Sequence, residues 1–120
     1  MDIRIGCDIV QVSKFEEKIH CKEYLLVRIF TEHELASSYS SASLAGRFAL
    51  KEAVMKALGI SAGNWLTIEV VNKPNGKPYC KFLSQEIQHS ILGQDVSISH
   101  DGDYAMAVST FILKESYDSQ

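Results

Sequence analysis

The segment from Arg47 to Gly59 predicts a helix that packing alone does not explain. Residues four apart lie on one face of a helix, so Phe48, Glu52 and Lys56 form a single stripe. A carboxylate and an ammonium therefore stand where the stripe is otherwise apolar, and we expect both to face a cleft beside the core. A carboxylate in a cleft can hold a cation, and a lysine one turn further along can hold a phosphate.

A second carboxylate, Asp8, lies in the apolar segment that opens the chain. Apolar and other residues alternate from Ile3 to Val10, which predicts a strand with Asp8 on the face opposite the isoleucines. Magnesium is commonly held by one or two carboxylates together with substrate phosphate. Asp8 and Glu52 would form such a pair if the strand packs beside the helix. The alternatives are a hydrogen-bonded strand-end carboxylate for Asp8 and a salt bridge along the helix between Glu52 and Lys56.

The composition predicts one folded domain that spans residues 1–120, since 46% of the residues are hydrophobic. No apolar run approaches the roughly 20 residues needed to span a bilayer, and the first residues lack the pattern of a signal peptide. We therefore expect a cytoplasmic protein without a membrane partner. Three cysteines, widely spaced and odd in number, favour reduced thiols over a zinc site or a disulfide framework.

The charge distribution argues against nucleic acid as a partner, because the net charge is −3. Positive charge is nevertheless concentrated locally, with Lys14, Lys18 and Lys22 at four-residue spacing. Such a basic face suits an acidic protein or an anionic small molecule, although an ordinary solvated helix face has the same pattern.

Local signals divide the chain into a helical first half and a second half rich in strands. Capping-box patterns begin at Ser13 and Thr31, and Gly59 is typical of the residue just past a helix end. The predicted helices cover residues 13–21, 24–30, 31–38, 43–58 and 84–92. The predicted strands cover residues 3–10, 66–71, 79–83, 95–100 and 104–113, with turns at Asn75-Gly76 and Asp101-Gly102. This order predicts an α+β fold, in which an antiparallel sheet accompanies a long central helix.

Two further sites carry weaker signals. His100 ends a predicted strand beside a turn, where a histidine is more often structural, although its charge can support an anion in a nearby pocket. Gly76-Lys77 is not a Walker-type phosphate loop, because Pro78 stands where serine or threonine is required.

Five motifs in order carry a resemblance to one family. They are residues 5–10 (IGCDIV), 28–34 (RIFTEHE), 45–59 (AGRFALKEA followed by KALG), 75–78 (NGKP) and 96–100 (VSISH). Together they cover nearly the whole chain, from about Ile3 to Val108. The chain closely resembles the holo-acyl-carrier-protein synthases, which are small 4′-phosphopantetheinyl transferases.

The resemblance implies a homotrimer of the 4′-phosphopantetheinyl transferase fold, with active sites between subunits. It also implies transfer of 4′-phosphopantetheine from coenzyme A to a serine of apo acyl carrier protein, with release of adenosine 3′,5′-bisphosphate. By this likeness Asp8 and Glu52 hold Mg²⁺, Glu52 helps a bound water to deprotonate the serine, and Lys56 contacts the phosphates; these three residues are catalytic. The residues implied in coenzyme A binding are Arg47, Lys56, Gly59, Asn75, Gly76, Lys77, Pro78 and His100.

The first helix departs from the family pattern at one position. The family usually has an arginine there to bind the acidic carrier protein, and this chain has Lys14. Lysine keeps the charge but loses the bidentate geometry, so the departure bears on carrier affinity more than on chemistry. Lys18 and Arg28 are possible further carrier contacts. A carrier of fatty acid synthesis and a carrier of polyketide synthesis both agree with this interpretation.

Two other functions compete with the enzyme. One is a non-catalytic module that binds coenzyme A or a nucleotide, and the other is a structural trimer with salt-bridged surface helices. Retention of both Asp8 and Glu52 favours the enzyme, because a protein that only binds would not need both carboxylates.

Overall fold

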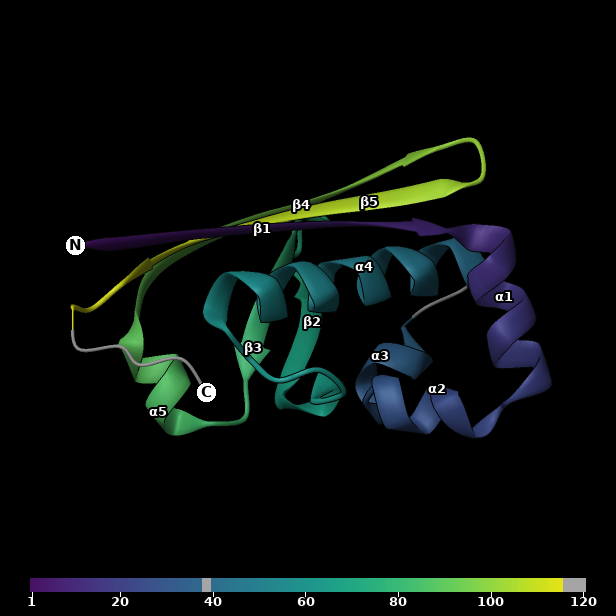
Figure 1. Cartoon of the computed structure of the whole chain (residues 1–120), viewed down its shortest axis with the longest axis horizontal. Coiled ribbons are helices and arrows are strands. Elements are labelled where there is room, and N and C mark those ends of the chain that lie inside the picture. The colour runs from purple at the N-terminus through teal and green to yellow at the C-terminus, as the bar shows by residue number, and fades with distance from the viewer. Residues whose placement is uncertain (38–39, 116–120) are drawn as a thin grey trace.

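A three-stranded antiparallel sheet lies on a long helix in the computed structural model, which describes residues 1–37 and 40–115 (Figure 1). The sheet has the order β1 (Asp2–Gln11), β5 (Tyr104–Leu113) and β4 (Ile91–Asp101). Helix α4 (Ser41–Leu58) runs beneath it. The predicted α+β fold with an antiparallel sheet and a long central helix is confirmed.

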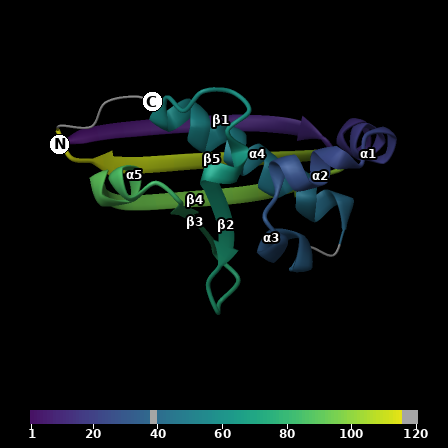
Figure 2. The same ribbon diagram turned by 90° about the horizontal axis from the view of Figure 1, so that it is seen from below.

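The remaining elements gather at the two ends and on one side of α4. Helices α1 (Val12–Cys21), α2 (Tyr24–Ile29) and α3 (Glu32–Ala36) lie together at one end, and α5 (Gln85–Ser90) lies at the other (Figure 1). A 3₁₀ turn, η1 (Trp65–Thr67), leads into the hairpin of β2 (Ile68–Asn72) and β3 (Pro78–Phe82). Figure 2 shows this hairpin projecting past the β4 edge of the sheet. None of the helices in the described part of the chain is long and apolar enough to span a membrane.

Two glycines allow α4 to approach the sheet closely. A Cβ on Gly6 would lie 1.9 Å from the carbonyl oxygen of Ala53, so no other residue fits there without a backbone shift. A Cβ on Gly46 would lie 2.9 Å from Ile98 Cγ2, which explains the glycine inside α4 by close packing against β4. β1 and α4 therefore touch directly, and this contact brings two distant parts of the sequence together.

The helix ends confirm some sequence signals and correct others. Thr31 and Glu34 form the predicted capping box, and Gly59 ends α4 in the left-handed conformation with φ 69°. Ser13 does not cap α1, which begins at Val12, because the backbone N–H and the hydroxyl of Ser13 both donate to the carboxylate of Asp103.

Several element boundaries also differ from the sequence prediction. β2 begins two residues later than predicted, since Trp65–Thr67 forms the 3₁₀ turn instead of strand. Helix α5 ends at Ser90, and the next residues join β4, where the pairing with β5 is irregular between Ile91 and Gly93. The polar composition of residues 114–120 predicts a tail that frays, and positions 116–120 of it lie outside the described residues.

The outer face of the sheet is apolar and exposed. The isoleucines of β1 lie on the exposed face, opposite Asp8 as predicted, and Ile5 is 70% exposed. The exposed apolar side chains of this sheet include Ile3, Ile5, Ile9, Tyr104, Met106 and Leu92. Asp8 lies on the other face, toward the helix, where Val10 packs against the core.

Candidate active site

The predicted stripe is the face of α4 that the core does not cover. Eleven of the fourteen residues from Ala45 to Leu58 are buried, whereas Phe48 and Glu52 are half-buried and Lys56 is exposed. Of this stripe, Phe48 lines a cavity beside the core, and a cleft that Glu52 and Lys56 both face stays a prediction.

Asp8 lies beside this stripe, because the close contact of Gly6 with α4 fixes the position of β1. The ammonium of Lys56 donates to Asp8 Oδ1 at 3.0 Å and to the carbonyl oxygen of Cys7 at 3.1 Å. The hydrogen bond and negative charge of Asp8 raise the pKa of Lys56, and the charge of Glu52 acts in the same direction. Lys56 thus interacts with both carboxylates of the predicted metal pair.

Trp65 is a site residue that sequence reasoning missed. Its indole Nε1–H donates to Glu52 Oε2 at 3.2 Å, and its ring lies 6.1 Å from the ring of Phe48. The only signal in the sequence is a lone tryptophan in the polar stretch after α4.

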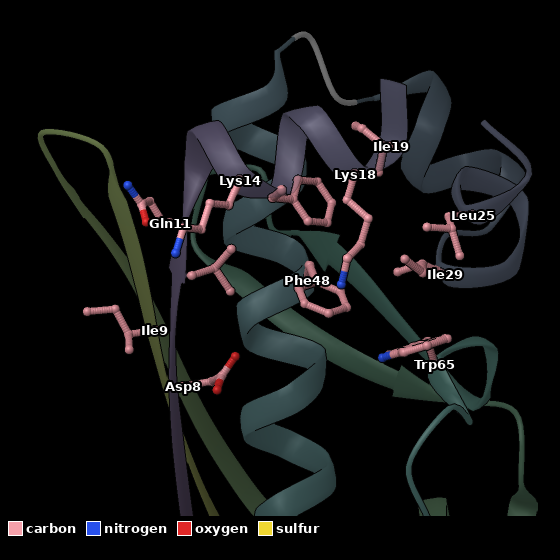
Figure 3. A pocket seen from close by; sticks show the side chains of 12 residues that line it. Asp8, Ile9, Gln11, Lys14, Lys18, Ile19, Leu25, Ile29, Phe48 and Trp65 are labelled. Carbon is pink, nitrogen blue, oxygen red and sulfur yellow. The ribbon is translucent and has the colours of Figure 1, made fainter. Parts of the chain in front are cut away.

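A cavity of about 420 Å³ opens beside Asp8, between β1, α1, α2 and α4. Its interior is largely apolar, with Phe48 and Trp65 among the lining side chains (Figure 3). Lys14 and Lys18 extend from α1 toward the same space, so both predicted carrier-contact lysines lie at this cavity. Arg28 lines a separate depression between α2 and η1.

A buried ion pair lies behind the cavity. Lys51 Nζ is 2.7 Å from Glu34 Oε1, and both side chains are fully buried. Lys51 also donates to the carbonyl oxygens of Ile29 at 2.7 Å and Trp65 at 3.2 Å. Burial lowers the pKa of Lys51, although the charge of Glu34 opposes the shift. Lys51 therefore has a structural role that its place in a basic stretch of sequence did not indicate.

A second cavity, of about 320 Å³, lies on the other side of α4, toward β4 and the β2–β3 turn. It brings together four of the residues implied in coenzyme A binding, namely Arg47, Gly76, Pro78 and His100. The guanidinium of Arg47 donates to the carbonyl oxygen of Glu34 and to Ser37 Oγ, both at 2.9 Å, and burial lowers its pKa.

The other residues implied in coenzyme A binding do not line this second cavity. Asn75 Oδ1 accepts from the backbone N–H of Lys77 inside the β2–β3 turn, which shapes the turn. Lys77 Nζ instead lies 2.8 Å from Asp95 Oδ1. Gly59 stands at the C-terminal end of α4, roughly 18 Å along the helix from Arg47 at 1.5 Å per residue. One chain therefore does not gather the whole predicted set at one place.

The donor set near Asp8 fits magnesium better than zinc. Among residues 1–37 and 40–115, no three histidine, cysteine, aspartate or glutamate side chains gather as a metal site. Asp8 and Glu52 would offer two hard carboxylates, and Mg²⁺ commonly takes its remaining ligands from water and substrate phosphate. In this structure one oxygen of Asp8, Oδ1, is paired with the Lys56 ammonium at 3.0 Å.

Known proteins provide an independent comparison. Residues 4–109 match the model of the 4′-phosphopantetheinyl transferase superfamily. The chain is 40% identical to holo-[acyl-carrier-protein] synthase of Moorella thermoacetica, with 98% of each chain covered. It is 37% identical to the synthase of Pseudoalteromonas atlantica, over 92% of this chain and 94% of the relative.

Solved structures agree with the sequence relatives. The holo-[acyl-carrier-protein] synthase of Helicobacter pylori, solved in complex with coenzyme A, superposes with a TM-score of 0.81 at 32% identity. That likeness covers 90% of this chain and 99% of the Helicobacter chain. From the motifs, the fold and these relatives together, the chain belongs to the holo-acyl-carrier-protein synthases of the 4′-phosphopantetheinyl transferase superfamily.

Proposed function

We propose that this protein transfers 4′-phosphopantetheine from coenzyme A to a serine of apo acyl carrier protein in the cytoplasm and releases adenosine 3′,5′-bisphosphate. The observation that carries the proposal is the pairing of Lys56 with Asp8, which lines an apolar cavity with two lysines, together with the electrostatic effect of Glu52 on Lys56. Family membership supports the same reaction.

The reaction is a phosphoryl transfer. The serine oxygen bonds to the phosphorus next to pantetheine, the bond from that phosphorus to the bridging oxygen breaks, and the nucleotide leaves with the electron pair. Glu52 is the carboxylate we assign to accept the serine proton, through a water molecule. Lys56 is assigned to the phosphate oxygens, where its positive charge stabilises the charge that develops as the bond breaks.

Asp8 and Glu52 are the residues we assign to Mg²⁺. Bound there, the ion would neutralise diphosphate charge and lower the pKa of a coordinated water. The two carboxylates come from different elements, β1 and α4, so one ion between them requires these elements to lie close, and Gly6 permits that close contact.

The arrangement of the implied coenzyme A residues favours sites shared between chains. Glu52, Lys56 and Gly59 belong to the C-terminal half and end of α4, with Asp8 of β1 paired to Lys56. The second cavity is bordered by a different group, namely Arg47, Gly76, Pro78 and His100. A coenzyme A molecule that contacts both groups would bridge two subunits. The exposed apolar face of the sheet, with Ile5 and Ile9, supports a homotrimer, since such a face is unusual on a monomer.

Lys14 and Lys18 are the residues we assign to the acidic carrier protein, with Arg28 as a further contact on α2. The two lysines extend from α1 into the cavity next to Asp8, so a carrier held there would present its serine to the reacting centre.

Mass spectrometry tests the reaction directly. An apo acyl carrier protein is incubated with this protein, coenzyme A and Mg²⁺. A gain of ~340 Da on the carrier serine, the mass of one phosphopantetheine group, is expected for covalent transfer. Binding of coenzyme A without a gain on several carriers would favour the rival, a non-catalytic coenzyme A or nucleotide-binding module.

A further inference from the structure

We propose that Trp65 is a positioning residue that sets the orientation of the Glu52 carboxylate. The inference rests on the proposed role of Glu52 in holding the metal and moving the serine proton. It concerns a residue outside the motifs that carried the family resemblance.

The side chain of Trp65 has a donor and a rigid ring, and both contact the stripe of α4. The indole Nε1–H donates to Glu52 Oε2 at 3.2 Å, and the ring packs against Phe48, one turn earlier on the same face. An indole nitrogen donates but does not accept a hydrogen bond, so it cannot exchange roles with the carboxylate. Glu52 Oε2 is therefore held, and Oε1 is the oxygen left for a cation or a proton.

The backbone of Trp65 is anchored as firmly as its side chain. Its carbonyl oxygen accepts from Lys51 Nζ at 3.2 Å, and Lys51 is in turn bonded to Glu34 at 2.7 Å in the buried ion pair. Glu34 Oε2 also accepts from the backbone N–H of Val70 at 2.7 Å, which fixes β2 just after the turn. Lys51 precedes Glu52 on α4, so the turn that carries Trp65 is tied to the helix that carries its partner.

This arrangement matters because a glutamate side chain has several rotatable bonds. On an open stripe of a helix, Glu52 could turn toward solvent or toward Lys56, one helical turn away. A hydrogen bond from a fixed indole restricts the carboxylate to one region, which is the usual task of a partner behind a metal ligand.

The test variant is Trp65→Phe, which keeps an aromatic ring and removes the donor. Mn²⁺ affinity is measured by electron paramagnetic resonance with coenzyme A present, and kcat and both KM values are measured with carrier. We expect Mn²⁺ affinity and kcat each to fall roughly tenfold, as for the loss of other partners of metal ligands, with KM for carrier and the melting temperature nearly unchanged. Leu66→Ala, in the same turn, is the matched control and should leave all four quantities unchanged.

Metal affinity and kcat within twofold of the unaltered protein in Trp65→Phe would overturn the inference. A loss confined to the melting temperature would also overturn it, because that result indicates a purely structural role.

A second measurement needs neither substrate nor metal. Trp65 is the only tryptophan, so the protein gives a single indole N–H resonance in a ¹H–¹⁵N spectrum. We expect this resonance to shift in Glu52→Ala and to stay in place in Glu86→Ala, an exposed carboxylate on α5. An indole signal unmoved in Glu52→Ala would overturn the contact. If the protein has no transferase activity but its indole resonance still shifts in Glu52→Ala, the proposed function is refuted and the contact between Trp65 and Glu52 is supported.

Discussion

Lys56 and Asp8 join the central helix to the first strand at the candidate active site, with 3.0 Å between Lys56 Nζ and Asp8 Oδ1. The Lys56 side chain is 60% exposed and Asp8 is 19% exposed, so the pair lies at the surface of the cleft. In our proposal the same carboxylate holds a divalent ion and the same ammonium holds phosphate. The protein without substrate therefore has a lysine competing for a metal ligand.

The variant Lys56→Met tests this competition. Removing the ammonium should tighten Mn²⁺ binding to the protein without coenzyme A by about two- to fivefold, which corresponds to the ~0.4–1 kcal/mol of an exposed ion pair. The transferase rate should fall, because the phosphate contact is lost. Direct titration with Mn²⁺ measures the first effect, and Lys81→Met, an exposed lysine on β3, is the control. Weaker Mn²⁺ binding in Lys56→Met would contradict the competition.

Glu52→Gln should separate catalysis from binding. The amide is nearly the same size but lacks the charge that holds a cation and the basicity that accepts a proton. Because the metal acts mainly on the transition state, kcat should fall by about 100-fold or more while the Kd for coenzyme A changes by about threefold or less. Steady-state kinetics and calorimetry measure the two quantities. Equal losses in both would contradict the assignment.

Lys14→Ala should raise the KM for the carrier protein and leave the KM for coenzyme A nearly unchanged. Lys14 lines the cavity beside Asp8 and is not among the residues that line the second cavity, at the β2–β3 turn. We expect KM for the acidic carrier to rise by about threefold to tenfold, and the difference from the unaltered protein to shrink as salt is added, since exposed charges are screened. A change confined to KM for coenzyme A would refute this assignment.

The start of α1 should be sensitive to acid. The Asp103 carboxylate accepts from the hydroxyl of Ser13 and from its backbone N–H at 3.0 Å, and the bond from the hydroxyl is the main cause that lowers the pKa of Asp103 from its usual value. A carboxyl with a lowered pKa stabilises the fold above its unfolded pKa and loses this contribution as pH falls through the folded value. Asp103→Asn should therefore lower the melting temperature near neutral pH, and the gap should close below about pH 4. A gap that stays constant down to pH 2.5 would contradict this role.

The elements that depend on local periodicity could be predicted from the sequence. The alternation around Asp8 and the four-residue stripe through Glu52 and Lys56 describe single elements, and both are confirmed. The capping-box signature was right at Thr31 and wrong at Ser13. The difference arises because Asp103, from a hairpin 90 residues away, bonds to Ser13.

Contacts between elements could not be predicted from the sequence, because each partner lies in a distant part of the chain. The partners Glu34 and Lys51 are 17 residues apart and meet only because α3 and α4 pack together. Trp65 reaches Glu52 only because η1 folds back against α4. In both cases the charged or aromatic side chain can be seen in the sequence, but the residue that it contacts is determined by the tertiary fold.

The buried pair makes a final prediction about stability. Removing one member of a buried ion pair leaves the other charge without compensation, so Lys51→Met should cost about 3–5 kcal/mol in the free energy of unfolding. The double variant Lys51→Met with Glu34→Gln should recover part of that loss, because it removes the uncompensated carboxylate. Lys77→Met, which breaks the exposed pair with Asp95, should cost far less, because solvent-exposed ion pairs contribute little to stability. Urea denaturation at one protein concentration measures the stability of all three variants. If Lys51→Met loses no more stability than Lys77→Met, the Lys51–Glu34 pair does not hold the turn that carries Trp65 in place.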